Sequence, residues 1–150
     1  MTNEERLQQM GITLPEAPAA GGLYTPFVQT GNLVFASGFV PAATEEPLKG
    51  KLGQDLTIEE GQEAARLCIL NMLAAWKRDF GTINNIKRAV KLVAFIQSAP
   101  DFYSQAQVAN GASQLVIDLF AAPAPARSAI GMAALPLNVP VEVEAVFEVE

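Results

Sequence analysis

The run PARSAIGMAALPLNVPVEVEAVFEV, residues 125–149, decides how the rest of the chain is interpreted. From Val139 to Val149, apolar residues alternate with glutamates, which predicts a strand with one buried face and one polar face. Arg127 lies at the start of this run and is the only positive charge after Lys91. An arginine among small and branched apolar residues usually has an anionic partner, so Arg127 is the first candidate for a binding residue.

Length and composition bound the class of protein. The chain has 150 residues, of which 50% are hydrophobic and 17% charged, as expected for one folded domain with a sizeable core. The net charge is -6 and no basic stripe occurs, which argues against binding to nucleic acid or to an anionic membrane. The low charge content favours self-association. No signal-peptide pattern or membrane-length apolar run is visible, so a soluble cytoplasmic protein is expected.

The absence of histidine restricts the chemistry most strongly. It excludes Ser-His-Asp and Cys-His catalysis, imidazole acid–base chemistry and the usual zinc or iron sites, so no metal is expected. No Gly-rich phosphate loop is visible either, so no cofactor is expected. The single cysteine, Cys68, lies beside the apolar stripe of a predicted helix, which favours a buried, unreactive thiol. Any reaction must therefore use arginine, carboxylates, hydroxyls, backbone groups and water.

Periodicity and chain-breaking residues predict an α+β domain from 21 to 150, preceded by an N-terminal arm, residues 1–20. Residues 41–56 read as a loop, either a solvated excursion or a lid. The expected elements are a short helix within 2–10, strands 24–29 and 33–40, a helix 57–80, a strand 87–97, a helix from about 98–101 to 120, and strands 127–135 and 139–149.

Two of these elements contain candidate site residues. In the strand 33–40, alternation places Ser37 on one face with Leu33, Phe35 and Phe39. Its hydroxyl either bonds a neighbouring backbone group or faces a ligand, and the following Gly38 would allow close approach to the backbone.

The second predicted long helix contains Asn110 and Gly111 in its middle. A mid-helix glycine costs roughly 1 kcal/mol relative to alanine. The position therefore indicates close packing, a ligand near Asn110, or a break in the helix.

The element order, the stretch GNLVFASGFVP at residues 31–41 and the closing PARS, Leu-Pro and VEVEA motifs resemble the RidA family, also called YjgF/YER057c/UK114. The similarity covers residues 24–149. It implies a chorismate-mutase-like α+β fold, with a mixed sheet and two helices on one face. It also implies a homotrimer with a ligand site in each cleft between subunits. Better-known members hydrolyse enamine/imine intermediates such as 2-aminoacrylate to 2-keto acids and ammonia.

This resemblance implies roles for two charged residues. Arg127 would hold the substrate carboxylate, and Glu142 in the VEVEA strand would orient the attacking water. Many members have cysteine two residues after the arginine, where this chain has Ala129. Because water addition to an imine needs no thiol, a hydrolase of the 2-iminobutanoate/2-iminopropanoate deaminase type is still expected.

The same resemblance assigns pocket positions to Tyr24, Ser37 and Gly38, and aligns Asn110 with a family asparagine. The ligand would be a small carboxylate or imino acid. A non-catalytic trimer that binds small carboxylates as a sensor or regulatory module is the alternative. A ribonuclease is disfavoured, because the chain is acidic and has no histidine.

Overall fold

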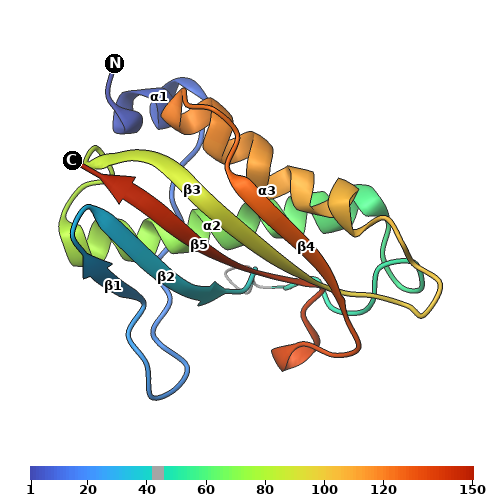
Figure 1. Ribbon diagram of the computed structural model, residues 1–150. Helices are drawn as coiled ribbons and strands as arrows, with labels where there is room; N and C mark the ends of the chain where they lie inside the picture. Colours follow the sequence, from blue (N-terminus) through green and yellow to red (C-terminus); the bar gives the residue numbers. More distant parts are fainter. Residues whose placement is uncertain (42–45) are drawn as a thin grey trace.

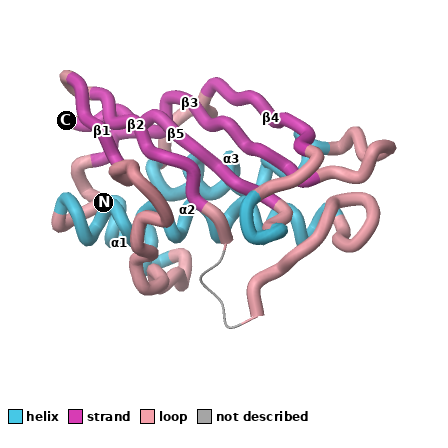
Figure 2. The backbone as a smooth tube through the Cα atoms, turned by 90° about the horizontal axis from the view of Figure 1, so that it is seen from below, coloured by secondary structure: helices cyan, strands magenta, loops and turns pink. Residues whose placement is uncertain are grey.

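A computed structural model describes residues 1–41 and 46–150, which form a two-layer α+β domain (Figure 1). A five-stranded sheet with the order β1-β2-β5-β3-β4 forms one layer, and helices cover one of its faces (Figure 2). The sheet is mixed, because β3 and β4 are parallel and the other pairs are antiparallel. The elements are α1 (Asn3–Gln9), β1 (Phe27–Thr30), β2 (Leu33–Phe39), α2 (Ile58–Phe80), β3 (Ile86–Gln97), α3 (Gln105–Phe120), β4 (Ala126–Met132), the 3-10 turn η1 (Pro136–Asn138) and β5 (Val141–Val149). The predicted α+β class and the placement of two long helices on one face are confirmed.

Strand β5 lies in the centre of the sheet, between β2 and β3. Its odd-numbered residues, from Val141 to Val149, are each at most 5% exposed and face the helices. The glutamates and Val146 alternate with them on the opposite face, as the sequence predicted. The sheet therefore has a helix-covered face and an open face, and these two names are used below.

Helices α2 and α3 begin and pack for reasons visible in the sequence. A capping box forms at the start of α2, where Thr57 and Glu60 exchange hydrogen bonds, as their three-residue spacing in the sequence predicts. In α3, a Cβ atom on Gly111 would collide with the backbone carbonyl of Gln62. Glycine at this position is thus required by the close approach of the two helices, which confirms the packing interpretation of the mid-helix glycine.

Three element boundaries differ from the prediction. Strand β1 starts at Phe27 rather than Tyr24, because Pro26 has no N–H for the ladder and the chain bends at residues 22–24 instead. Helix α3 starts at Gln105, after a turn at Pro100–Asp101, rather than at 98–101. Strand β4 ends at Met132 rather than Leu135, since the chain bends away there and Leu135 N–H donates to the side chain of Gln97.

The predicted common face of Leu33, Phe35, Ser37 and Phe39 is wrong for its last member. The pairing of β2 with β5 shifts between Ala36 and Phe39, which is a bulge. An extra residue in one strand reverses the alternation beyond it. Phe39 consequently turns to the helix-covered face, where it is 8% exposed.

Residues 42–45, part of the predicted loop 41–56, lie outside the described residues. In the described remainder, Leu52 is fully buried and pairs by isolated bridges with Leu56 and Ser98. Gly50 carbonyl oxygen accepts from the Gln97 side chain, 2.9 Å away. The segment 50–56 is thus tied to the end of β3.

The N-terminal arm packs against the helical layer of its own chain. The buried Asn3 side chain donates to the carbonyl oxygens of Ile83 (2.9 Å) and Ile86 (2.8 Å). Arg6 donates to the carbonyl oxygen of Leu119, at the end of α3, over 3.1 Å. These contacts hold α1 beside α3 and the start of β3 (Figure 1).

Candidate functional site

Arg127 lies on the edge strand β4, and its side chain extends over α3. One guanidinium nitrogen, Nη1, donates to Asn110 Oδ1 over 2.7 Å and to Ser113 Oγ over 3.0 Å. The other, Nη2, donates to the carbonyl oxygen of Ala106 over 3.2 Å. All three acceptors are neutral, so they orient the guanidinium and leave its charge uncompensated. Ser113 was not predicted, although it lies one helical turn after Asn110 and therefore on the same face.

A cavity of about 550 Å³ adjoins this guanidinium. Its lining combines polar groups from α3 with apolar groups from α3 and the connector to β4: Asn110, Ser113, Gln114, Ile117, Ala124, Pro125 and Arg127. Within residues 1–41 and 46–150 of one chain, no carboxylate forms an ion pair with Arg127. The cavity therefore offers a half-buried cation and apolar contact surface to an anion of small size.

Glu142 lies near the start of β5, on the open face. A Cβ atom on Gly38 would collide with the Glu142 carboxylate, so glycine at the β2 bulge makes room for it. Burial raises the pKa of the Glu142 carboxyl, and the neighbouring Glu144 charge raises it further. The structure thus brings Gly38 and Glu142 together and gives the carboxylate a stronger affinity for a proton.

Ser37 and Tyr24 make hydrogen bonds within their own region. Ser37 Oγ donates to the carbonyl oxygen of Thr25 over 2.7 Å. Of the two roles predicted for this hydroxyl, the structure shows the hydrogen bond to a neighbouring backbone group. Tyr24 Oη accepts from the N–H of Gly21 over 3.0 Å, and its side chain is 49% exposed. Tyr24 lies in the loop before β1, rather than on the predicted strand.

A shallow groove of about 380 Å³ runs along the open face beside Ser37. It is lined by residues of β1, β2, β3 and β5: Val28, Phe35, Ala36, Ser37, Lys91, Val93, Glu144, Ala145 and Val146. Sequence reasoning did not single out Lys91, because a lone lysine in a strand carries no signal of its position on a groove wall.

Arg127 and Glu142 lie on opposite faces of the sheet. Arg127 pairs with Leu92, which pairs with Ala145, and these two are at most 4% exposed beneath the helices. Glu142 pairs with Phe95 on the other face. Directly paired residues share a face. One chain by itself therefore does not bring the two predicted catalytic residues together.

Cys68 is buried, as predicted. Its thiol donates weakly to the carbonyl oxygen of Val141 over 3.5 Å. Burial, and secondarily the charge of Glu142, raise the pKa of this thiol well above its usual value, which keeps it protonated and unreactive. In the described part of the chain, no group of three or more Cys, Asp or Glu residues is placed to hold a metal ion.

These features define a class of protein: an α+β domain with a mixed sheet, a guanidinium cavity on its helix-covered side and a carboxylate on its open face. The chain belongs to the Endoribonuclease L-PSP family, the family of RidA and YjgF, whose model matches residues 14–149. Among the described residues, no helix is long and apolar enough to span a membrane.

Three relatives illustrate this membership. Protein TCP17 of Trypanosoma cruzi is 40% identical over 145 residues, which cover 95% of this chain and 91% of that protein. The solved structure of Atu1372 from Agrobacterium tumefaciens is 39% identical, with a TM-score of 0.88, and the match covers 99% of this chain and 92% of that one. A 2-iminobutanoate/2-iminopropanoate deaminase of Dermatophagoides farinae is 30% identical over 93% of this chain and 95% of its own length.

Proposed function

We propose that this protein hydrolyses small reactive 2-imino acids of the 2-aminoacrylate type to 2-keto acids and ammonia. The proposal depends above all on Arg127, a half-buried cation at a cavity, whose hydrogen-bond partners are all neutral. The deaminase name of the relative from Dermatophagoides farinae supports the reaction class. The family's descriptive name refers to an endoribonuclease, but a net charge of -6 and the absence of histidine disfavour RNA as substrate.

The geometry around Arg127 suits a carboxylate. A guanidinium can donate two parallel hydrogen bonds to a carboxylate, and this fork fixes the orientation of the bound acid. Asn110 and Ser113 hold the group from the α3 side, so the side chain needs little reordering when the anion binds. Fixing the carboxylate also fixes the adjacent C2 carbon, which is the reacting atom.

Glu142 supplies the base. The enamine first tautomerises to the imine, as one proton leaves nitrogen and another is added at the terminal carbon. Water then adds to C2, and Glu142 accepts one of its protons and passes it to nitrogen, which gives a carbinolamine. The carbinolamine hydroxyl then gives its proton through the same carboxylate to nitrogen as the C–N bond breaks and the C=O bond forms. The products are a 2-keto acid and ammonia. The raised pKa of Glu142 makes it a better base than an ordinary carboxylate.

The two residues would meet between chains. Because Arg127 and Glu142 lie on opposite faces of one sheet, a shared site requires the open face of one chain to approach the β4 edge of another. The open face carries large apolar side chains that are 41–59% exposed, namely Val28, Phe35 and Ile130. Such a surface favours self-association, and we propose a homotrimer with one site in each cleft.

The alternative is a trimer that binds small carboxylates without turnover, as a sensor or regulatory module. One observation favours it: the residues of this chain that line the Arg127 cavity do not include Glu142. Saturable binding of 2-ketobutyrate without hydrolysis of any imine would support this alternative.

The test of the proposed function is the loss of enzymatically generated 2-aminoacrylate, followed for wild type and Arg127→Ala. We expect turnover by wild type and a loss of at least about 100-fold in the variant, since the anchoring hydrogen bonds and the orientation of C2 are both removed. Arg66→Ala is the matched control, because Arg66 is a partly exposed arginine on α2 that pairs with Glu63. Equal rates of 2-aminoacrylate loss for wild type and Arg127→Ala would show that Arg127 does not hold the substrate carboxylate. An inactive wild type would favour the non-catalytic binding module.

A further inference from the structure

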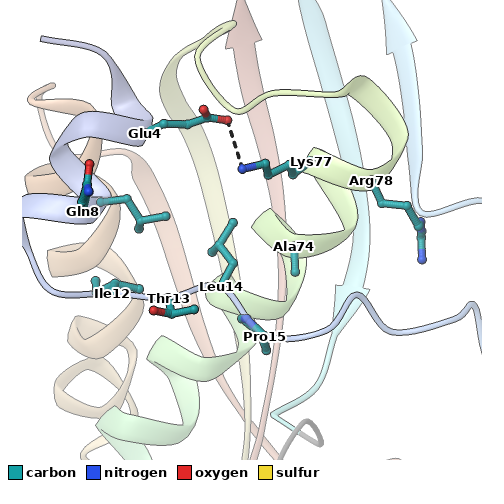
Figure 3. A pocket seen from close by; sticks show the side chains of 10 residues that line it. Glu4, Gln8, Ile12, Thr13, Leu14, Pro15, Ala74, Lys77 and Arg78 are labelled. Atoms are coloured by element: carbon teal, nitrogen blue, oxygen red, sulfur yellow. Dashed lines mark ion pairs between the residues drawn. The ribbon is translucent and has the colours of Figure 1, made fainter.

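Two cavities of about 550 Å³ differ in whether their cation is neutralised. One lies between the N-terminal arm and the later half of α2, where Lys77 pairs with Glu4 over 3.6 Å (Figure 3). Both residues line that cavity, so their charges compensate each other. The other cavity adjoins Arg127, which has no carboxylate partner among residues 1–41 and 46–150 of its own chain. An anion is therefore expected at Arg127 rather than at the arm.

The hydrogen bonds around Arg127 decide which atoms its neighbours can offer to a ligand. A guanidinium has donors only, so Asn110 and Ser113 must each present an oxygen to it. Asn110 keeps its amide N–H groups, and Ser113 keeps its hydroxyl proton. Neither of these donors has an acceptor among the described residues. The polar groups nearest to Arg127 in the cavity therefore have donors to offer, which suits an anion.

The hydroxyl of Ser113 is the less expected of these donors. A serine inside a helix commonly donates to the carbonyl oxygen four residues earlier, which is Ala109 here. The described structure contains no such bond, and Ser113 Oγ accepts from Arg127 Nη1 over 3.0 Å. The half-buried Ser113 side chain lines the cavity, on the face of α3 that also carries Asn110. Its proton is thus free to be donated at the place where the cation lies.

Arg127 itself retains donors for the same anion. Nη1 is used by Asn110 and Ser113, and Nη2 gives one proton to the carbonyl oxygen of Ala106. Within the described residues, the Nε proton and the second Nη2 proton have no acceptor. A carboxylate has two oxygens that can each accept more than one hydrogen bond. It can therefore accept from Arg127 and from a neighbouring hydroxyl at once.

We propose that Ser113 is a substrate-binding residue, whose hydroxyl donates to the bound carboxylate while its oxygen holds Arg127. This inference rests on the carboxylate site of the proposed function and adds a contact to it. Hydrogen bonds to an ionised acceptor are stronger than those between neutral groups. The loss of this one hydroxyl should therefore be measurable in the affinity for a small carboxylate.

The test measures binding of 2-ketobutyrate to the full-length protein by isothermal titration calorimetry. Ser113→Ala should weaken binding about tenfold, as expected for a hydrogen bond to a charged group. Ser113→Thr keeps the hydroxyl and should bind within about twofold of wild type. Ser104→Ala is the matched control and should change nothing, because Ser104 precedes α3, makes no side-chain cap hydrogen bond and does not line the cavity. Thermal unfolding of each variant checks that the fold is intact.

A double variant separates direct contact from an effect through Arg127. Arg127→Lys keeps the positive charge but loses the planar fork, so weak binding of 2-ketobutyrate should remain. If Ser113 contacts the anion, Ser113→Ala should weaken binding by a further factor of about three or more in this background. If Ser113 serves only to hold the guanidinium, Ser113→Ala should have no further effect there.

Three outcomes would overturn the proposal. Equal affinity of wild type and Ser113→Ala would exclude the contact, and an effect that disappears in the Arg127→Lys background would leave Ser113 as a positioning residue only. No saturable binding of 2-ketobutyrate to wild type would mean that the cavity is not a carboxylate site.

Failure of the proposed hydrolysis is a separate result. A wild-type protein that binds 2-ketobutyrate and responds to Ser113→Ala in both backgrounds, but does not consume 2-aminoacrylate, would retain the Ser113 contact and exclude the hydrolase. Turnover of 2-aminoacrylate by wild type and Ser113→Ala at equal rates, with equal affinity for 2-ketobutyrate, would retain the hydrolase and exclude the contact.

Discussion

The two faces of the sheet differ in what covers them, and the candidate site is divided between them. On the helix-covered face, α2 and α3 leave the β5 side chains at most 5% exposed, and Arg127 at the edge turns toward α3. On the open face, Phe35 is 47% exposed, and Glu142 lies beside the bulge at Gly38. The difference shows that a single chain contains both the guanidinium of Arg127 and the carboxylate of Glu142, but holds them on opposite faces of its sheet.

The largest expected effect comes from the open face. Glu142→Gln should lower kcat for imine hydrolysis by roughly 10²–10⁴, the usual contribution of a general base. In wild type, activity should fall as the pH drops through the raised pKa of Glu142, because the protonated carboxyl cannot accept a proton from water. The pH profile of kcat/KM measures this, and the acid limb should be missing from the residual activity of Glu142→Gln. An unchanged acid limb in the variant would assign the base to another group.

A mixing experiment tests whether the two faces cooperate between chains. Arg127→Ala and Glu142→Gln should each retain only a small residual activity alone, but co-expression in equal amounts should restore about a quarter of wild-type activity. Each site then contains an intact Arg127 with a probability of about one half, and an intact Glu142 from another chain with the same probability. The product of the two is about a quarter. Specific activity of the purified mixed assemblies is the measurement.

The reciprocal control is wild type mixed with the double variant. If Arg127 and Glu142 of a site came from one chain, about half of the sites in this mixture would be intact. If they came from two chains, about a quarter of the sites would be intact. Background activity in the first mixture, together with half activity in the second, would show that each site is built within one chain.

The smallest expected effect concerns the packing of the helix-covered face. Gly111→Ala should destabilise the protein by about 1–3 kcal/mol, although alanine is the better helix former. The new Cβ meets the backbone carbonyl of Gln62, which no rotamer change can move, so α2 and α3 must separate. Denaturant unfolding measures this, with Gln107→Ala, an exposed change on the same helix, expected within about 0.5 kcal/mol of wild type. Equal stability of Gly111→Ala and wild type would contradict the close contact.

A substitution on the open face should have a different effect from Gly111→Ala. Phe35→Ser removes exposed apolar surface rather than packing, so it should weaken self-association in sedimentation experiments more than it changes the unfolding of the chain. Loss of stability comparable to that of Gly111→Ala, with unchanged association, would show that the open face is not an interface.

Local patterns predicted most of the architecture. The capping box at Thr57 and the alternation of β5 each depend on neighbours in sequence, and both were found. The boundary at Leu135 was missed because a tertiary contact with the Gln97 side chain replaces the strand pairing there. The boundary at Tyr24 was missed although its cause is local, since Pro26 cannot donate to the ladder. Arg127 was selected from its surroundings in sequence, but its partner Ser113 became visible only once α3 lay over β4.

The sequence alone determined the element order, the burial of Cys68 and of one face of β5, and the residue types available for chemistry. Side-chain alternation and helical periodicity are local properties, and a histidine-free composition excludes whole classes of mechanism. Only the tertiary structure decided the strand order, the bulge that turns Phe39 inward, and the faces on which Arg127 and Glu142 lie. The physical reason is that alternation says which residues share a face, whereas the docking of helices and the register of pairing decide which face is covered.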